Sequence, residues 1–347
     1  MLRISVICAA ALALSVPAAA VAQAQPKPLA ALSGDAYTHA NSGVTAPAVL
    51  EGLPRTKAAE LESPELDVIF EWATRDSSEV VTLYVYRVPS GAVPVWFDRA
   101  IWAVEGRAIY GKATRAGLPI AFTPPRQASA AGMMAVWSLA DSSYRTTALA
   151  IMPLGEWLVK LRISSRSLDA EGIAARLRRS IEAVGWPAKV PPAPTAVPVA
   201  DCATPLRFSG PAKPAAQEMS DVLAGALIGV GSAAVPRTWC RDPAKLDSAG
   251  LYRPADTDDE YLLALSDAGR GISVHPATTL LLGNEKPKAA RWSVDLVLPG
   301  QTVMYPAYDR LPPPDQLMTI IRGPARSSVT TWGAKRAVKV SPGAVRN

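Results

Sequence analysis

The stretch TTALAIMPLGEWLVKLRIS, residues 146–164, decides how the first half of the chain folds. It holds two apolar runs, Thr146–Met152 and Trp157–Ser164, and each has the length and the apolar character of a strand. Pro153 and Gly155 separate the runs and favour a tight turn. Two strands joined by so short a connection run antiparallel, so the stretch predicts a β-hairpin.

Further strands are predicted on the N-terminal side of this hairpin. Met133–Leu139 is one candidate, and Leu66–Ala73 and Val80–Val88 are two more. Within the last of these, valine and leucine at positions 81, 83 and 85 alternate with tyrosine at 84 and 86. Such alternation places the two sets of side chains on opposite faces of a sheet.

Two helices accompany the strands. The first is predicted over Pro94–Tyr110, where apolar residues recur at helical spacing and proline lies near the first turn. The second is predicted over Asp169–Val184, followed by the stop signals Gly185 and Pro187. The order of these elements predicts an α+β fold in which an antiparallel sheet is packed by two helices.

This order of elements is loosely similar to that of Mog1/PsbP-like domains. The resemblance covers only the first domain and rests on element order, without motif residues. It implies a non-enzymatic accessory module and transfers no site residue.

Length and composition predict two mixed α+β domains. In the second domain, strands are expected over 261–265, 271–275, 292–298 and 302–305, and helices over 214–230 and 315–321. The expected division is a signal peptide at 1–24, a flexible lead at 25–60, a first α+β domain at 61–186, a proline-rich linker at 187–198, a second α+β domain at 199–325 and a flexible basic tail at 326–347.

The N-terminus has the pattern of a secretory signal peptide. Met1-Leu2-Arg3 gives a positive start, and Ile4–Ala22 is an uncharged, mainly apolar stretch. Small residues then allow cleavage after Ala22 or Ala24. An uncleaved membrane anchor is the alternative, but the apolar run is near the lower limit for spanning a bilayer. We therefore expect a periplasmic or secreted protein without a transmembrane helix in its mature form.

Cysteine usage agrees with export. Cleavage would remove Cys8 and leave the pair Cys202 and Cys240. We expect these two to form a disulfide, since an even number of cysteines in an oxidising compartment is typical of bonded pairs. The alternative is two buried free thiols.

No motif in the sequence indicates catalysis or a cofactor. GxSxG, Walker A and GxGxxG patterns are absent, so no cofactor is expected. His39 lies in the expected flexible lead, and His275 precedes a proline at the end of a strand candidate. Zinc spacing is missing, and the acidic run 256–260 is interpreted as a solvated turn instead of a calcium loop.

One helix departs from the usual amphipathic pattern. On the predicted helix Pro94–Tyr110, Trp102 and Ile109 project away from the apolar stripe, where polar residues are expected. They are either covered by another part of the chain or exposed for contact with a partner. Tryptophan is a frequent anchor of interfaces, so these two residues are our candidates for a binding surface.

Charge gives a weaker indication. The chain has 36 basic and 30 acidic residues, a net charge of +6, which does not favour nucleic acid as a partner. The surplus includes a basic C-terminal group that could contact an anionic membrane: Arg326, Lys335, Arg336, Lys339 and Arg346.

Together these observations favour an exported, non-catalytic accessory protein that binds an envelope protein or a cell-wall component. Two alternatives stay open. One is an envelope hydrolase that acts on glycan through two carboxylates facing each other in a cleft, at least one of them desolvated. The other is a peripheral membrane protein attached through its basic tail.

Overall fold

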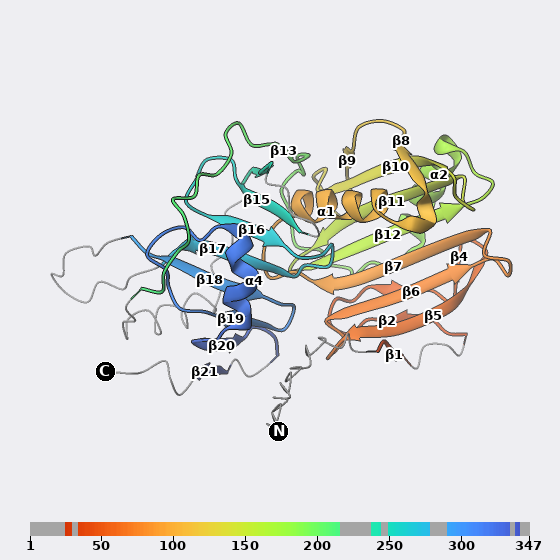
Figure 1. Cartoon of the computed structure of the whole chain (residues 1–347). Coiled ribbons are helices and arrows are strands. Elements are labelled where there is room, and N and C mark those ends of the chain that lie inside the picture. The colour runs from red at the N-terminus through yellow and green to blue at the C-terminus, as the bar shows by residue number, and fades with distance from the viewer. Residues whose placement is uncertain are drawn as a thin grey trace, which may run out of the picture.

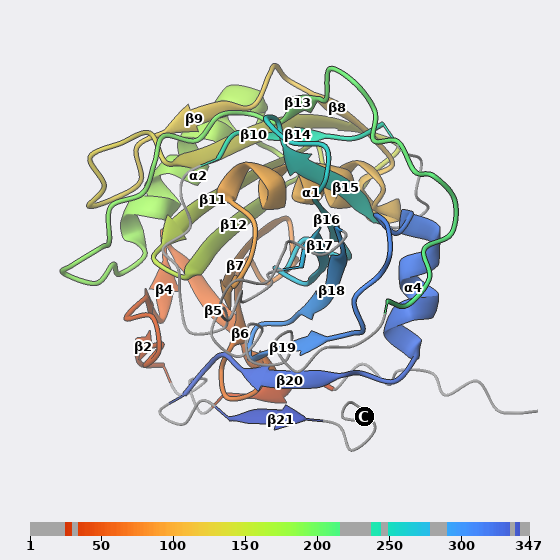
Figure 2. The same ribbon diagram turned by 90° about the vertical axis from the view of Figure 1, so that its left-hand side faces the viewer.

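The computed structural model describes residues 25–29, 34–215, 237–243, 249–277, 290–333 and 337–340. These residues form two large sheets, and the first half of the chain builds one and the second half the other (Figure 1). Seen from the side, helix α1 (Val93–Glu105) lies between them (Figure 2). We call the two parts the first and second sheet bodies.

The first sheet is antiparallel throughout its described pairings, in the order β1-β5-β6-β7-β12-β11-β10-β8, with β4 paired to β5 and β9 to β10. The predicted hairpin becomes β11 and β12 at its centre. Its strands are β1 (Lys27–Pro28), β4 (Val49–Leu50), β5 (Leu53–Glu62), β6 (Asp67–Ala73), β7 (Glu79–Arg87), β8 (Lys112–Arg115), β9 (Ile120–Phe122), β10 (Gly132–Ala140), β11 (Thr146–Leu154) and β12 (Trp157–Ser165).

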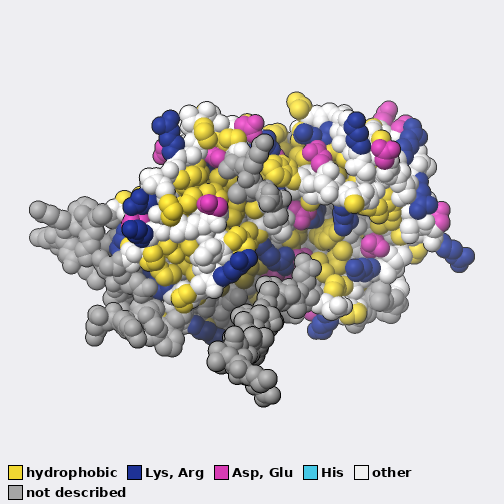
Figure 3. All heavy atoms as spheres, in the orientation of Figure 1, with side chains coloured by type: hydrophobic (Ala, Val, Ile, Leu, Met, Phe, Trp, Pro, Cys, Tyr) yellow, Lys and Arg dark blue, Asp and Glu magenta, His cyan; other side chains and the backbone are white. Residues whose placement is uncertain are grey.

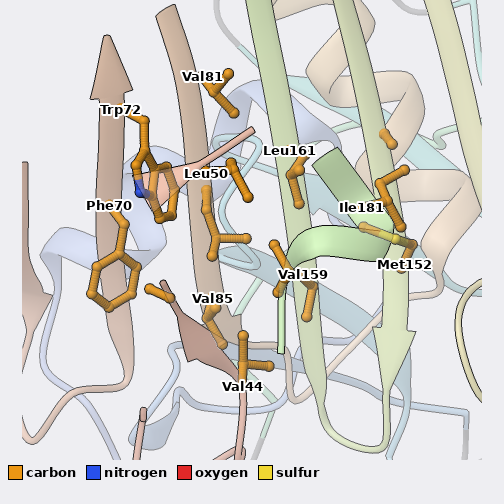
Figure 4. Close-up of a cluster of buried hydrophobic side chains, with 14 of the residues drawn as sticks. Val44, Leu50, Phe70, Trp72, Val81, Val85, Met152, Val159, Leu161 and Ile181 are labelled. Carbon is orange, nitrogen blue, oxygen red and sulfur yellow. The ribbon is translucent and has the colours of Figure 1, made fainter. Parts of the chain in front are cut away.

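One face of this sheet is covered by helix α2 (Ala170–Ala183) and by the N-terminal segment. Asp169 caps the helix, accepting a hydrogen bond from the Gly172 amide at 2.8 Å. Valine and leucine at positions 81, 83 and 85 point into this core, as their alternation predicts. Figure 4 shows part of the cluster, with Trp72 of β6 and Ile181 of α2 among the packed side chains.

The other face packs against α1. Trp96, Phe97 and Val104 of the helix are buried together with Trp137 of β10. Residues of the second sheet body, Tyr252 among them, belong to the same buried cluster. The helix is therefore enclosed by both sheets, which explains why its apolar stripe is wide. It is shorter than predicted because it ends before Gly106, a poor helix former, and a 3-10 turn, η2 (Ala108–Tyr110), follows.

The second sheet has the order β13-β14-β15-β16-β17-β18-β19-β20-β21 and is antiparallel except for the pair β13–β14. Helix α4 (Pro314–Arg322) packs against it through Leu317 and Ile320. The predicted hairpins are confirmed as β16–β17 and β18–β19. The strands are β13 (Ala200–Asp201), β14 (Trp239–Arg241), β15 (Gly250–Pro254), β16 (Tyr261–Ala264), β17 (Gly271–Pro276), β18 (Trp292–Val297), β19 (Gln301–Met304), β20 (Ser327–Thr330) and β21 (Val338–Val340).

The expected disulfide is present. Cys202 and Cys240 are bonded, and β13 runs beside β14, so the bond ties the start of the second body to its sheet. The predicted helix over 214–230 falls almost entirely outside the described residues.

The prediction of a flexible lead over residues 25–60 is wrong. This segment forms β1, β4, most of β5 and the small pair β2 (Tyr37–Thr38) and β3 (Thr45–Ala46). Val44 and Leu50 are almost fully buried in the first core. The strands could not be predicted because they are short or carry charged residues. Backbone hydrogen bonds, not a run of apolar side chains, hold them in place.

The proline-rich segment after α2 has no regular helix or strand from 187 to 199. It lies against the first body, because Ala196 N donates to Ala130 O at 2.9 Å and Gln127 Nε2 donates to Pro191 O at 3.0 Å. The segment is thus held along the first sheet body before the chain enters the second.

Candidate functional site

Several ion pairs lie in the contact between the two sheet bodies. Lys160 of β12 donates to Asp267 of the β16–β17 turn at 2.8 Å. Arg270 of the same turn lies 2.5 Å from Glu62 and 3.5 Å from Asp67. The Lys160 ammonium also lies over the Tyr84 ring, 4.5 Å from its centroid. One turn of the second body therefore docks on the first sheet through ion pairs.

Asp67 is the desolvated carboxylate of this cluster. Its side chain is almost fully buried, and burial raises its pKa to about 6 even though Arg270 and Lys160 work in the opposite direction. Among the described residues, Asp67 Oδ1 has no hydrogen-bond partner. For Asp267, burial also raises the pKa, but the Lys160 charge and hydrogen bond outweigh it and leave the pKa lowered.

These carboxylates do not have the arrangement expected of a glycan hydrolase. One desolvated acid is present, as that alternative requires. However, Asp67 is 3% exposed, and it lies beside Arg270, which is 31% exposed and also pairs with Glu62. The carboxylate of Asp67 is thus engaged by a cation of the second body, and the geometry favours a structural role for the cluster.

The Asp67→Asn variant should change the pH dependence of stability in one direction. The raised pKa means that the ionised form of Asp67 costs stability, so its favourable contribution is complete below about pH 4 and is lost as pH rises through about 6. We expect the free energy of unfolding of Asp67→Asn, relative to wild type, to rise between pH 4 and pH 8 by on the order of 2–3 kcal/mol. Urea denaturation at several pH values measures this. A constant or falling difference would contradict the assignment.

A second contact between the bodies centres on Arg87, the last residue of β7. Its guanidinium donates to Pro299 O at 2.5 Å, to Thr331 Oγ1 at 2.9 Å and to Thr331 O at 3.0 Å. It also pairs with Glu156 at 2.7 Å. The Arg87 side chain is 6% exposed, so its bonds to Pro299 and Thr331 form away from water, whereas Glu156 is 50% exposed.

Aromatic rings continue this contact. Trp332 lies 5.2 Å from the Arg87 guanidinium and 5.4 Å from the Trp157 ring, centroid to centroid. His39 packs edge-on against the same Trp157 at 5.0 Å. Residues near both ends of the described chain thus meet at one tryptophan.

A third contact joins α1 to the second sheet. Asp98 accepts hydrogen bonds from Arg241 at 2.8 Å and from the Tyr252 hydroxyl at 2.7 Å. Arg241 also pairs with Asp201 at 2.7 Å. Asp98 can be buried because its hydrogen-bond partners, Arg241 and Tyr252, belong to the second sheet body.

Neither histidine is placed as a general base. His39 is fully buried, with Nδ1 2.7 Å from Ser42 Oγ and Nε2 2.8 Å from Glu65 O, and burial lowers its pKa. His275 Nε2 lies 3.0 Å from Asp295 Oδ2, and Nδ1 lies 3.0 Å from Pro276 O. Both ring nitrogens of His275 are thus engaged with oxygen atoms of its own sheet.

The surroundings of His275 favour its charged form. Burial lowers its pKa, but the hydrogen bond and charge of Asp295 outweigh this effect, so the pKa is raised. The sequence places His275 at the end of a strand but does not indicate its partner Asp295, which comes from the neighbouring strand β18.

The described part of the chain contains no group of three His, Cys, Asp or Glu residues that could hold a metal ion. The acidic run 256–260 instead binds a cation of the protein itself, since Arg237 pairs with Asp256 at 3.2 Å and with Glu260 at 2.5 Å. Among the described helices, none is long and apolar enough to span a membrane.

Trp102 and Ile109, the residues predicted for binding, are both exposed at the surface. Trp102 of α1 is 40% exposed and Ile109 of η2 is 54% exposed. The Arg99 guanidinium lies 5.5 Å from the centroid of the Trp102 ring. Their role in binding remains a prediction.

Sequence reasoning missed two further exposed apolar residues nearby in the chain. Leu118 is 86% exposed and Ile120 is 47% exposed. They lie in the turn between β8 and β9 and at the start of β9, and both strands pair with β10. In the sequence, the stretch that holds them is marked by the absence of any acidic residue between Glu105 and Asp141.

The basic tail differs from the expectation. Arg326 is 5% exposed and its amide donates to Met304 O at 2.8 Å, and the residues after it form β20. Lys339 is exposed but lies within β21, paired to β20. A flexible tail is therefore wrong for 326–333 and 337–340. Lys335, Arg336 and Arg346 lie outside the described residues.

Comparisons with known proteins add little to these observations. No protein-family model and no curated protein matches the chain. A solved structure, the solution structure of cyanobacterial PsbP (CyanoP) from Synechocystis sp. PCC 6803, is similar at 12% identity and a TM-score of 0.31. The match covers 44% of this chain and 92% of that one. A likeness of this size says nothing about function.

Proposed function

We propose that this chain is a non-catalytic accessory protein that works in the periplasm or outside the cell and binds a component of the cell envelope. The observation that carries the proposal is the exposure of Trp102 on the outer side of α1, a helix whose inner side is buried by both sheets. A large aromatic ring left at the surface of an otherwise well-packed helix is typical of an interaction site.

Other observations support this proposal. The Cys202–Cys240 disulfide suits an oxidising compartment. The charged contacts that could serve chemistry, at Asp67 and at His275, are both engaged in holding strands together. Binding through the exposed surface of α1 therefore uses residues that the fold itself leaves free.

The Trp102→Ala variant should lose binding without losing stability. We expect its retention by the isolated native envelope fraction to fall by at least about tenfold, as for an interface anchor. Its free energy of unfolding should change by less than about 1 kcal/mol, because the ring is partly exposed. Co-sedimentation measures retention, and urea denaturation measures stability.

Met318→Ala is the matched control, since Met318 is 41% exposed on α4 of the other body. It should leave retention unchanged. Equal retention of Trp102→Ala and wild type would contradict the proposal, and a large loss of stability in Trp102→Ala would instead make the ring part of the core.

A further inference from the structure

The segment that follows α1 carries charge of one sign. Between Glu105 and Asp141 there is no acidic residue, but there are four basic ones: Arg107, Lys112, Arg115 and Arg126. Arg115 pairs with Glu105 at 3.0 Å. The other three form no ion pair within the described part of the chain and are exposed. This part of the surface is therefore complementary to an anionic partner.

Apolar side chains project from the same segment. Leu118 lies in the β8–β9 turn, next to Gly117, whose φ of +145° needs a residue without a side chain. Ile120, at the start of β9, and Ile109, before β8, are about half exposed. The turn extends beyond the rest of the sheet at the top of Figure 1, and Figure 3 shows hydrophobic, basic and acidic side chains along the upper surface of the molecule. We call residues 107–126 the apolar–basic segment.

We propose that the apolar–basic segment binds the headgroup region of an anionic phospholipid membrane, with Leu118 inserted and the basic side chains on the phosphates. This rests on the proposed function and names the envelope component as lipid. Surfaces that bind membranes combine projecting apolar residues with Lys and Arg. A protein hot spot is instead surrounded by packed neighbours that exclude water, which does not describe a leucine exposed to 86%.

The segment offers exposed basic side chains that are placed by the first sheet. Arg326 of the tail is buried, whereas Arg107, Lys112 and Arg126 are exposed. Because β8 and β9 are both paired to β10, the turn that carries Leu118 is held in place at the edge of the first sheet. Binding would then need little ordering of the chain.

The test uses the purified full chain and protein-free vesicles of phosphatidylglycerol mixed with phosphatidylcholine, compared with vesicles of phosphatidylcholine alone. We expect binding only to the anionic vesicles, and binding that weakens as salt is raised. Leu118→Ser should weaken it by roughly tenfold. Lys112→Gln and Arg126→Gln should each weaken it by roughly fivefold at low salt.

Two variants serve as controls. Val197→Ser removes an apolar side chain that is 55% exposed outside the segment, and Lys339→Gln removes a basic charge from the C-terminal strand. Both should bind anionic vesicles like wild type. Equal binding to both kinds of vesicle, or a loss on Lys339→Gln with none on Leu118→Ser, would overturn the inference.

The outcome separates this inference from the proposed function. Retention by the native envelope fraction that depends on Trp102, without binding to protein-free anionic vesicles, would overturn the lipid assignment and leave an envelope protein or a cell-wall component as the partner. Absence of both would overturn both proposals. Vesicle binding that depends on Leu118 supports the lipid assignment.

Discussion

Replacing Arg87 with methionine is expected to lower the free energy of unfolding by roughly 2–4 kcal/mol, because buried acceptors of the second body lose their donor. The guanidinium bonds Pro299 and Thr331 of the second body and Glu156 of the first, and it is nearly buried. Methionine keeps much of the volume but leaves these acceptors without donors. Urea denaturation followed by tryptophan fluorescence measures the change.

Arg179→Met provides the comparison. Arg179 pairs with Glu51 at 2.9 Å but is 58% exposed, so its loss should cost less than about 1 kcal/mol. If Arg87→Met and Arg179→Met were equally mild, Arg87 would not hold the two bodies together.

Removal of the disulfide has the second large effect. The Cys202–Cys240 bond closes a loop with a sequence separation of 38, and the chain-entropy model gives about 4 kcal/mol for a loop of that length. We expect the double variant Cys202→Ser, Cys240→Ser to unfold at correspondingly lower urea concentration.

Treating the wild-type protein with a reductant tests the same interaction without substitution. The loss of stability on reduction should match that of the double serine variant, and the double variant itself should not respond to the reductant. A reductant effect on the variant would mean that some other process is being measured.

The sequence predicted the elements whose side chains repeat regularly and face a core. In β7, the alternation of Val81, Leu83 and Val85 with tyrosines correctly assigns two faces. The helical spacing of Trp96, Phe97 and Val104 correctly indicates α1, since these residues are buried. In both cases the physical cause, burial of one side, leaves a local period in the sequence.

The missed parts depend on partners far away in the chain. β5 contains several charged residues and is a strand because its backbone pairs with β6. Asp98 looks like a surface residue until Arg241 and Tyr252 are placed against it. Leu118 lies in a turn, where no regular spacing of apolar residues indicates its exposure. Such features come from tertiary contacts that leave no local pattern.

The edge-on packing of His39 and Trp332 against Trp157 has a consequence for folding during synthesis. Trp332 comes late in the chain but packs against the core of the first sheet body, to which His39 and Trp157 belong. A partly synthesised chain therefore lacks this contact. Until residue 332 has been synthesised, Trp157 lacks one of its two aromatic neighbours.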